Sequence, residues 1–231
     1  KATDPAALQN WLSQHGYNVP DDIKPVVDAY VAGHYDFLAL KLVPGAGVQS
    51  MRPVRVTTLG ASPVLPLRMV AAGTGASVGI TLWVVGEGRY EPQNFPWFQI
   101  KNEDIAWNWG TNASTYRDVR AKRTADSGGK AWEMESSLSL SQQQISNALQ
   151  YGYFVGPGGV GGAAASSTQD YPANTPAESD RLRQDDLDAL FKGIPDSTMR
   201  VTRVRTDLAR AGLAEDLVMT ASKDQAVIST S

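Results

Sequence analysis

Residues 8–42 read LQNWLSQHGYNVPDDIKPVVDAYVAGHYDFLALKL and predict a helix, a tight turn, a second helix and a buried strand. Asp4 and Pro5 suit the start of the first helix, because aspartate caps helix N-termini and proline fits the first turn. Gly16 and Gly33 are expected to end the two helices, since glycine accepts the left-handed backbone that follows many helices. We therefore expect a helical hairpin that packs on a sheet.

Apolar segments predict strands through the middle and the end of the chain. The expected strands lie at residues 54–57, 65–69, 77–85, 130–138, 199–206 and 217–221. Residues 77–85 have apolar side chains at both odd and even positions, and so on both faces of a strand, which favours a central strand covered on both sides. Short turn segments between successive strands favour antiparallel pairing, because parallel strands need long crossover connections.

Three further helices complete the expected secondary structure. They lie at residues 115–124, 141–151 and 180–192. The last of them turns Leu187, Leu190 and Phe191 inward at helical spacing. Residues 156–177 are rich in glycine, alanine and serine and predict a flexible loop, since they bury too little surface to offset their ordering entropy. We expect a single α+β domain over residues 1–231, with an antiparallel or mixed sheet flanked by an N-terminal helix pair and a C-terminal helix.

Composition excludes several classes of chemistry. The 231 residues carry a formal net charge of −3, which is unlike the basic field of a nucleic-acid binder, so no nucleic-acid partner is expected. The absence of cysteine excludes thiolate catalysis, disulfides and cysteine–zinc sites. His15 and His34 have no second ligand at helical spacing, so no metal and no cofactor are expected. No apolar run approaches the roughly 18 residues of a transmembrane helix.

Two glycine-containing segments match the sequence patterns of enzyme motifs. Residues 75–79, GASVG, match the G-x-S-x-G pattern of serine hydrolases, but the following residues predict a strand where that motif needs a helix. Residues 156–161, GPGGVG, match the glycine pattern of dinucleotide sites, but no helix with an apolar face follows them. A hairpin turn and a linker are the better interpretations.

Paired charges on two expected strands are the first candidate for chemistry. Glu133 and Glu135 are two positions apart, as are Arg203 and Arg205, so each pair faces one side of its strand. If the strands are neighbours, the pairs can form a charge ladder on an exposed face. Alternatively, they line a polar cleft of a hydrolase-like enzyme, where carboxylates do acid–base work beside arginines that hold an anion.

Aromatic residues between positions 95 and 109 are the second candidate. They comprise Trp97, Trp107 and Trp109 with two phenylalanines, and Trp107 and Trp109 are expected to share a strand face. A tryptophan-rich core explains them, whereas exposed rings suit stacking on sugars or on a flat partner surface. The leading hypothesis is a non-enzymatic binding or structural protein with a protein or glycan partner. Homo-oligomeric assembly is an open alternative.

Several short motifs are similar to those of one bacterial family. They are W-L-x-x-x-G-Y-x-V-P at residues 11–20, F-L-A-L-K at 37–41, G-K-A-W-E-M-E at 129–135, and segments at 187–193, 201–206 and 216–219. On these motifs the chain resembles the C-terminal portion of the family known as domain of unknown function 2330. The resemblance implies the fold and a secreted or cell-envelope location, and it implies no activity. We therefore expect an extracytoplasmic protein whose signal peptide was removed before Lys1.

Overall fold

A computed structural model describes residues 4–41, 45, 54–58, 63–71, 75–151 and 176–229. The described helices are α1 (Pro5–Gln14), α2 (Lys24–Ala32), α3 (Leu67–Val70), α4 (Tyr116–Asp126), α5 (Gln142–Tyr151) and α6 (Pro176–Phe191). The described strands are β1 (Val64–Leu65), β2 (Ser77–Glu87), β3 (Tyr90–Pro92), β4 (Trp97–Phe98), β5 (Trp107–Asn108), β6 (Ala113–Ser114), β7 (Trp132–Ser139), β8 (Met199–Ala209) and β9 (Leu217–Ala221). Short 3-10 helices cover Asn102–Asp104 and Arg210–Leu213.

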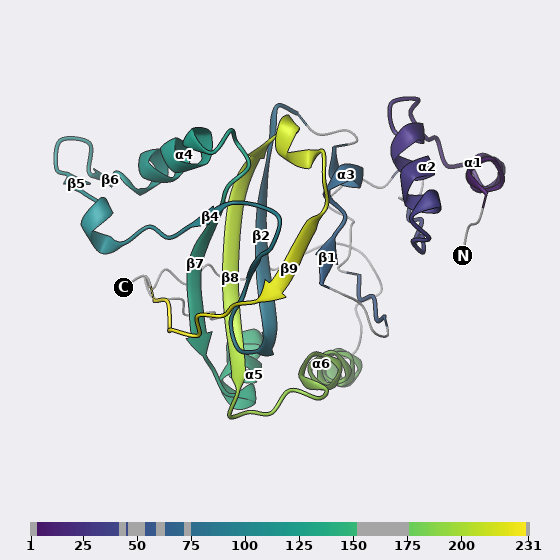
Figure 1. The fold of residues 1–231 in the computed structure, drawn as a ribbon. Helices are drawn as coiled ribbons and strands as arrows, with labels where there is room; N and C mark the ends of the chain where they lie inside the picture. The colour runs from purple at the N-terminus through teal and green to yellow at the C-terminus, as the bar shows by residue number, and fades with distance from the viewer. Residues whose placement is uncertain are drawn as a thin grey trace.

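Two sheets stack around the main core (Figure 1). β2, β8, β7 and β4 form a four-stranded sheet in that order, antiparallel except where β4 runs parallel to β7. β1, β9 and β3 form an antiparallel three-stranded sheet. Trp132, Met134 and Leu208 of the larger sheet meet Leu217 and Met219 of β9 in one buried cluster. The expected α+β fold, with a mixed sheet, an N-terminal helix pair and a C-terminal helix, is therefore confirmed.

Helices lie against the other face of the four-stranded sheet. Ile145 of α5 and Phe191 of α6 pack with Val201 near one end of β8. α4 lies toward the other end of β8, where Arg120 Nη2 is 2.7 Å from a carboxylate oxygen of Asp207. The polar side chains of the candidate site lie along this face, next to α4.

The N-terminal helix pair is tied to the rest of the molecule through Asp216. Tyr30 of α2 donates a hydrogen bond to Oδ1 of Asp216, and Nη2 of Arg68 lies 2.7 Å from Oδ2. Burial raises the pKa of the Asp216 carboxyl, but the bonds from Arg68 and Tyr30 outweigh that effect and hold the pKa below its ordinary value. This contact joins α2 to the segment that precedes β9.

We expect Tyr30→Phe to lower the free energy of unfolding by about 1–3 kcal/mol, because the change leaves a largely buried carboxylate short of one hydrogen bond. Urea denaturation at neutral pH measures the effect. Tyr35→Phe is the matched control, since Tyr35 packs edge-on against Tyr30 but is 39% exposed. Equal losses in the two variants would contradict a special role for the Tyr30–Asp216 bond.

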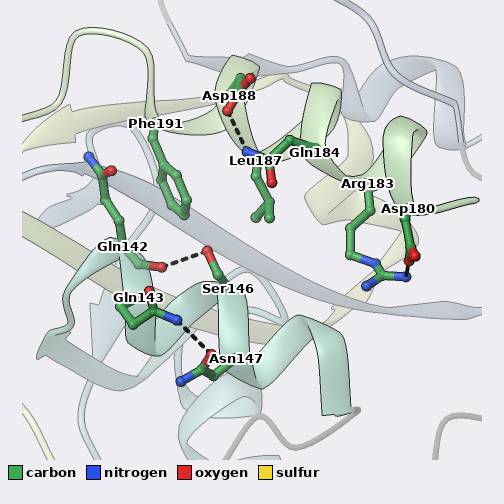
Figure 2. Close-up of a pocket in the computed structure, with 10 residues that line it drawn as sticks. All are labelled: Gln142, Gln143, Ser146, Asn147, Asp180, Arg183, Gln184, Leu187, Asp188 and Phe191. Carbon is green, nitrogen blue, oxygen red and sulfur yellow. Dashed lines mark hydrogen bonds and ion pairs between the residues drawn. The ribbon is translucent and has the colours of Figure 1, made fainter. Parts of the chain in front are cut away.

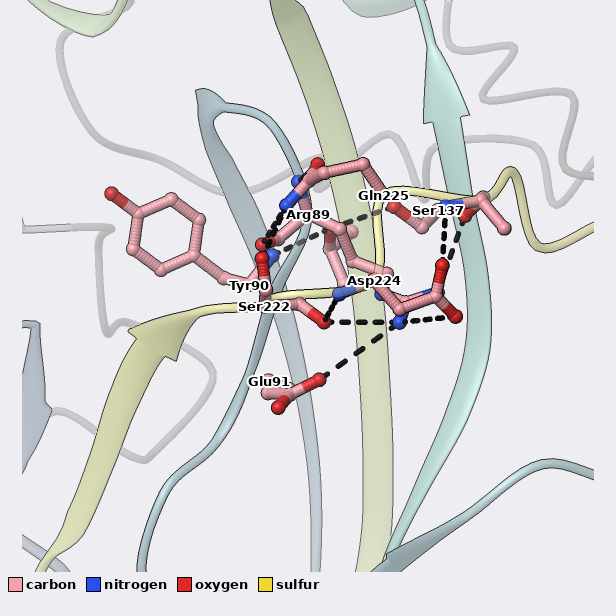
Figure 3. Close-up of polar contacts among 9 residues, drawn as sticks. Arg89, Tyr90, Glu91, Ser137, Ser222, Asp224 and Gln225 are labelled. Carbon is pink, nitrogen blue, oxygen red and sulfur yellow. Dashed lines mark hydrogen bonds and ion pairs between the residues drawn. The ribbon is translucent and has the colours of Figure 1, made fainter.

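A buried arginine anchors the segment that follows β9 (Figure 3). Arg89 is 2% exposed, and its Nη2 lies 3.0 Å from the Ser222 hydroxyl and 3.1 Å from a carboxylate oxygen of Asp224. Farther along, Ile228 and Ser137 of β7 exchange two backbone hydrogen bonds of 2.8 and 3.1 Å. These contacts hold the C-terminal part of the described chain against the sheet.

Some of the expected strands are wrong. Residues 36–41 and 54–58 are not in strands, and Leu40 and Val56 are each 64% exposed. Of the expected strand at 65–69 only the start is in β1, because the residues after Pro66 form α3. β2 lies at the edge of its sheet, with one face partly exposed, rather than in the centre. These segments were expected to be strands because apolar and polar residues alternate in them. A strand also needs a neighbouring strand to bond with, and a local pattern does not reveal whether one is present.

The other expected helices and strands are present, most of them with shifted ends, and β9 has the expected bounds. In α6, Leu187 is buried as expected, whereas Leu190 is 39% exposed and does not point inward. The expected loop at residues 156–177 falls outside the described residues, apart from its last two positions, which begin α6. The organisation of the chain as a single domain stays a prediction.

Candidate functional site

Two tryptophans of the aromatic cluster stand on the surface. Trp107 is 49% exposed and Trp109 is 86% exposed, and their rings lie 6.1 Å apart at an angle of 70°. Trp97 in β4 is 37% exposed, while Phe95 belongs to the core. Trp109 follows β5 instead of sharing its strand face with Trp107. A tryptophan-rich core therefore does not account for Trp107 and Trp109.

A short hairpin of β5 and β6 presents these rings. Oδ1 of Asn108 accepts two backbone N–H groups of the turn, at 2.9 and 3.2 Å, and Asn112 adopts a left-handed φ of 52° that asparagine tolerates. At the base, Ala106 and Thr115 exchange two hydrogen bonds, each of 2.9 Å. We call residues 106–115 the tryptophan hairpin. Local hydrogen bonds thus fix the hairpin that carries the two exposed rings.

The candidate carboxylates lie at a β-bulge in β7. The register against β8 pairs Glu133 with Arg205 and Ser136 with Arg203, so Glu135 is the extra residue. Glu133 is 1% exposed and Glu135 is 7% exposed. The fold thus brings the predicted acidic and basic pairs together, but it buries the carboxylates instead of arranging a ladder on an exposed face.

Tyr116, the first residue of α4, joins the two carboxylates. Its hydroxyl oxygen lies 2.8 Å from Oε2 of Glu133 and 2.9 Å from Oε1 of Glu135. Burial raises the pKa of the Tyr116 hydroxyl, and the charges of Glu133 and Glu135 raise it further, so the phenol keeps its proton. The sequence shows a tyrosine at an expected helix start, but it contains no signal that places the hydroxyl on these carboxylates.

The two arginines form the border between the carboxylates and solvent. Nε of Arg203 lies 2.7 Å from Oε2 of Glu135, and Nη1 of Arg205 lies 3.8 Å from Oε1. The Arg203 side chain is 32% exposed, against 9% for that of Glu135. The Arg203 guanidinium also stacks over Trp83, with Cζ 4.8 Å from the ring centre. The buried acid pair is therefore connected to the surface through cations.

Glu133 has the surroundings of a neutral carboxyl group. Burial raises the pKa of Glu133 from 4.5 to about 7, and the neighbouring Glu135 charge adds to the effect. The Tyr116 hydrogen bond and the charges of Arg120 and Arg205 act in the opposite direction. Oε1 of Glu133 is buried without a hydrogen-bond partner among the described residues, which costs less for a protonated carboxyl than for a carboxylate. The cluster can therefore bind and release a proton near neutral pH.

A polar groove of about 490 Å³ lies between α5 and α6 (Figure 2). Its lining consists of Gln142, Gln143, Ser146, Asn147, Asp180, Arg183, Gln184, Leu187, Asp188 and Phe191. Several of the polar groups bond within their own helix, as Gln184 does to Asp188 at 2.7 Å and Gln143 to Asn147 at 2.8 Å. These bonds stabilise the helices and leave few side chains directed at a ligand.

Among the described residues, histidine, aspartate and glutamate side chains form no group of three or more that could hold a metal ion. Within those residues, the helices are also too short or too polar to cross a bilayer.

One family model matches the chain. It is the model of DUF2330, described as an uncharacterized protein conserved in bacteria, and it covers residues 1–146. The match therefore includes the tryptophan hairpin, Tyr116, Glu133 and Glu135, but not the two arginines of β8. It covers the N-terminal part of the chain and not the C-terminal part, so the expected likeness beyond residue 187 is not supported. No curated protein and no solved structure matches the chain.

Proposed function

The chain belongs to the bacterial family DUF2330, and we propose that it is a non-enzymatic binding protein whose contact surface is the tryptophan hairpin. The observation that carries this proposal is the exposure of Trp107 and Trp109, at 49% and 86%, on a hairpin held by its own hydrogen bonds. Leaving large apolar rings in water contributes nothing to folding stability. Tryptophans in such positions are the side chains that most often anchor a partner.

A neutral glycan is the partner that best fits this surface. The two rings stand nearly perpendicular, at 70°, and so form a corner instead of a flat platform. One ring can stack on the apolar face of a sugar while the other bounds its edge. Asn108 and Asn112 belong to the same hairpin and are exposed, and side-chain amides can bond to sugar hydroxyls. The net charge of −3 disfavours a polyanionic glycan.

We expect Trp109→Ala to weaken glycan binding about 30-fold, since losing an anchoring aromatic costs about 2 kcal/mol or more. Neutral hexasaccharides of β-linked glucose and of N-acetylglucosamine are the probes, and isothermal titration calorimetry gives the Kd. Trp11→Ala is the matched control, because Trp11 is 46% exposed but lies in α1, far from the hairpin in Figure 1. Binding that both variants weaken equally would contradict the proposal.

Self-association is the competing use of the same surface. Native mass spectrometry would then show multiples of the 24.8 kDa chain that disappear in Trp109→Ala. Absence of hexasaccharide binding together with such multiples would replace the glycan by a second copy of the chain. A monomer that binds a hexasaccharide would support the glycan.

We also propose that the protein acts outside the cytoplasm, in the periplasm, on the cell surface or as a secreted protein. The support is the likeness of its motifs to a family of mostly exported proteins. Cell fractionation of a bacterium that encodes the chain tests the proposal. Recovery of the protein with cytoplasmic markers would contradict it.

A hydrolase-like enzyme is the second candidate, favoured by a carboxyl with a pKa of about 7 beside Tyr116 and Arg205. Such a group suits general acid catalysis near neutral pH. A substrate would have to reach Glu133, whose residue surface is 1% exposed. Hydrolysis of a chromogenic glycoside or ester that disappears in a folded Glu133→Gln variant would favour the enzyme over the binding protein.

A further inference from the structure

The Tyr116 hydroxyl has a single hydrogen but lies between two carboxyl groups. It lies within hydrogen-bond distance of both Glu133 and Glu135, at 2.8 and 2.9 Å. A phenol has one hydrogen and donates one full hydrogen bond, so the second bond needs a proton on a carboxyl group, which then donates to the phenol oxygen. Glu135 already pairs with the cation of Arg203 at 2.7 Å, whereas Oε1 of Glu133 is buried without a hydrogen-bond partner among the described residues. The extra proton therefore belongs on Glu133.

α4 is attached to the sheet mainly through polar groups. Its buried residues are Arg120 and Thr124, and its sequence YRDVRAKRTAD offers little apolar surface for packing. Tyr116 joins it to the sheet through the two glutamates, and Arg120 does so through Asp207. A helix that packs through a wide apolar stripe is held by buried apolar area, which protonation of one group does not change. α4 depends on charge balance instead.

The tryptophan hairpin is continuous with this attachment. Thr115 immediately precedes Tyr116, and it exchanges two hydrogen bonds of 2.9 Å with Ala106, which immediately precedes Trp107. A shift of Tyr116 at the start of α4 is therefore passed to the base of the hairpin through adjacent backbone. Figure 1 shows α4 and β5–β6 together on one side of the sheet.

We propose that Glu133, Tyr116 and Glu135 form a proton-binding site that docks α4 on the sheet and, through Thr115, positions the tryptophan hairpin, and that loss of the shared proton loosens both. This inference rests on the proposed function only in treating the hairpin as the contact surface. With Glu133 charged, two carboxylates face one phenol hydrogen in a buried place, and repulsion and desolvation both oppose that state.

Charged groups from each neighbouring element face this site. α4 contributes Arg120, and β8 contributes Arg203, Arg205 and Asp207, while β7 supplies the glutamates themselves. Arg120 and Arg205 lower the pKa of Glu133, but burial and the Glu135 charge prevail, and the resulting pKa of about 7 places the transition near neutral pH. The 2.7 Å Arg120–Asp207 pair is a second attachment of α4 to β8, separate from the contacts of Tyr116.

Fluorine NMR of the whole chain labelled with fluorotryptophan tests the site without any ligand. Assignment by single Trp→Phe variants separates the resonances of the six tryptophans. We expect the Trp107 and Trp109 resonances to shift with a midpoint near pH 7, and Glu133→Gln to remove that transition. Both proteins retain His15 and His34, so the comparison isolates Glu133. Tyr116→Phe, which lacks the bridging hydroxyl, is expected to uncouple the resonances from Glu133.

The outcomes separate this inference from the proposed function. Hairpin resonances that do not respond to pH in the wild type, or that titrate equally in Glu133→Gln, would overturn the proton-binding site. A Glu133-dependent shift without hexasaccharide binding would support the site and reject the glycan. Hexasaccharide binding that is equally strong at acidic and alkaline pH, in a protein whose resonances do not titrate, would reject the site and keep the glycan.

Discussion

Replacing Glu133 with glutamine is expected to raise the free energy of unfolding by about 3 kcal/mol in mildly alkaline solution, because the wild-type protein there holds a buried negative charge. In the unfolded chain this carboxyl ionises near 4.5, whereas in the folded protein its pKa is about 7. Between these values the folded state binds more protons than the unfolded state. Wild-type stability therefore falls as pH rises through this window and levels off above it.

Urea denaturation from acidic to alkaline pH measures this effect. Glu133→Gln should match the wild type within about 1 kcal/mol below the window, since glutamine resembles the protonated acid. Glu135→Gln is the control with the opposite sign: it removes the partner of Arg203 and is expected to destabilise by about 1.5–3 kcal/mol. A Glu133→Gln gain that is the same at every pH, or a loss in alkaline solution, would contradict the raised pKa.

Arg89→Met is expected to lower the free energy of unfolding by about 3 kcal/mol. This value is at the lower end of the range for breaking a buried ion pair, because the acidic partners of Arg89 are nearer to solvent than Arg89 itself. The Arg89 side chain is 3% exposed, against 24% for Glu91 and 69% for Asp224. Methionine keeps much of the apolar contact of the arginine stem but cannot bond to Ser222. Chemical denaturation gives the loss in stability.

The same variant is expected to release the C-terminal segment before the rest of the protein unfolds. Hydrogen exchange of the Ile228 amide, which is bonded to Ser137, should become faster than exchange in β8. Arg55→Met is the matched control, because Arg55 pairs with Asp186 on the surface and such pairs contribute about 0–1 kcal/mol. Uniformly faster exchange along the chain would contradict a local anchor.

Apolar periodicity predicted strands that pair with a neighbour in a sheet, and it also predicted strands in segments that are not paired. β8 and β9 fall where alternation put them, since both lie inside sheets whose ladders bury one side. The segment around Val56 alternates equally well but is not in a strand, and Val56 is 64% exposed. Pairing is a long-range property, and alternation in one segment does not reveal whether another strand lies beside it.

The sequence predicted the acidic and basic members of the carboxylate site, but not the group that links them. Spacing placed Glu133 and Glu135 on one side of a strand, with Arg203 as a candidate partner. The role of Tyr116 depends on how α4 docks, and that docking involves few apolar residues that a pattern could identify. Exposure of Trp109 was also open, because tryptophan is common both in cores and at interfaces.

The bulge at Glu135 makes β7 unusually sensitive to changes in chain length. Glu133 lies opposite Arg205, and Leu138 lies opposite Val201. Glu133 and Leu138 therefore face the same side of the sheet, toward the helices, although an odd number of positions separates these two residues. A regular strand would put them on opposite faces. Deleting one residue between them would leave either the acid or the leucine facing the wrong layer. Insertions and deletions should therefore be rarer in β7 than in the turn of the tryptophan hairpin, whose residues are exposed to solvent.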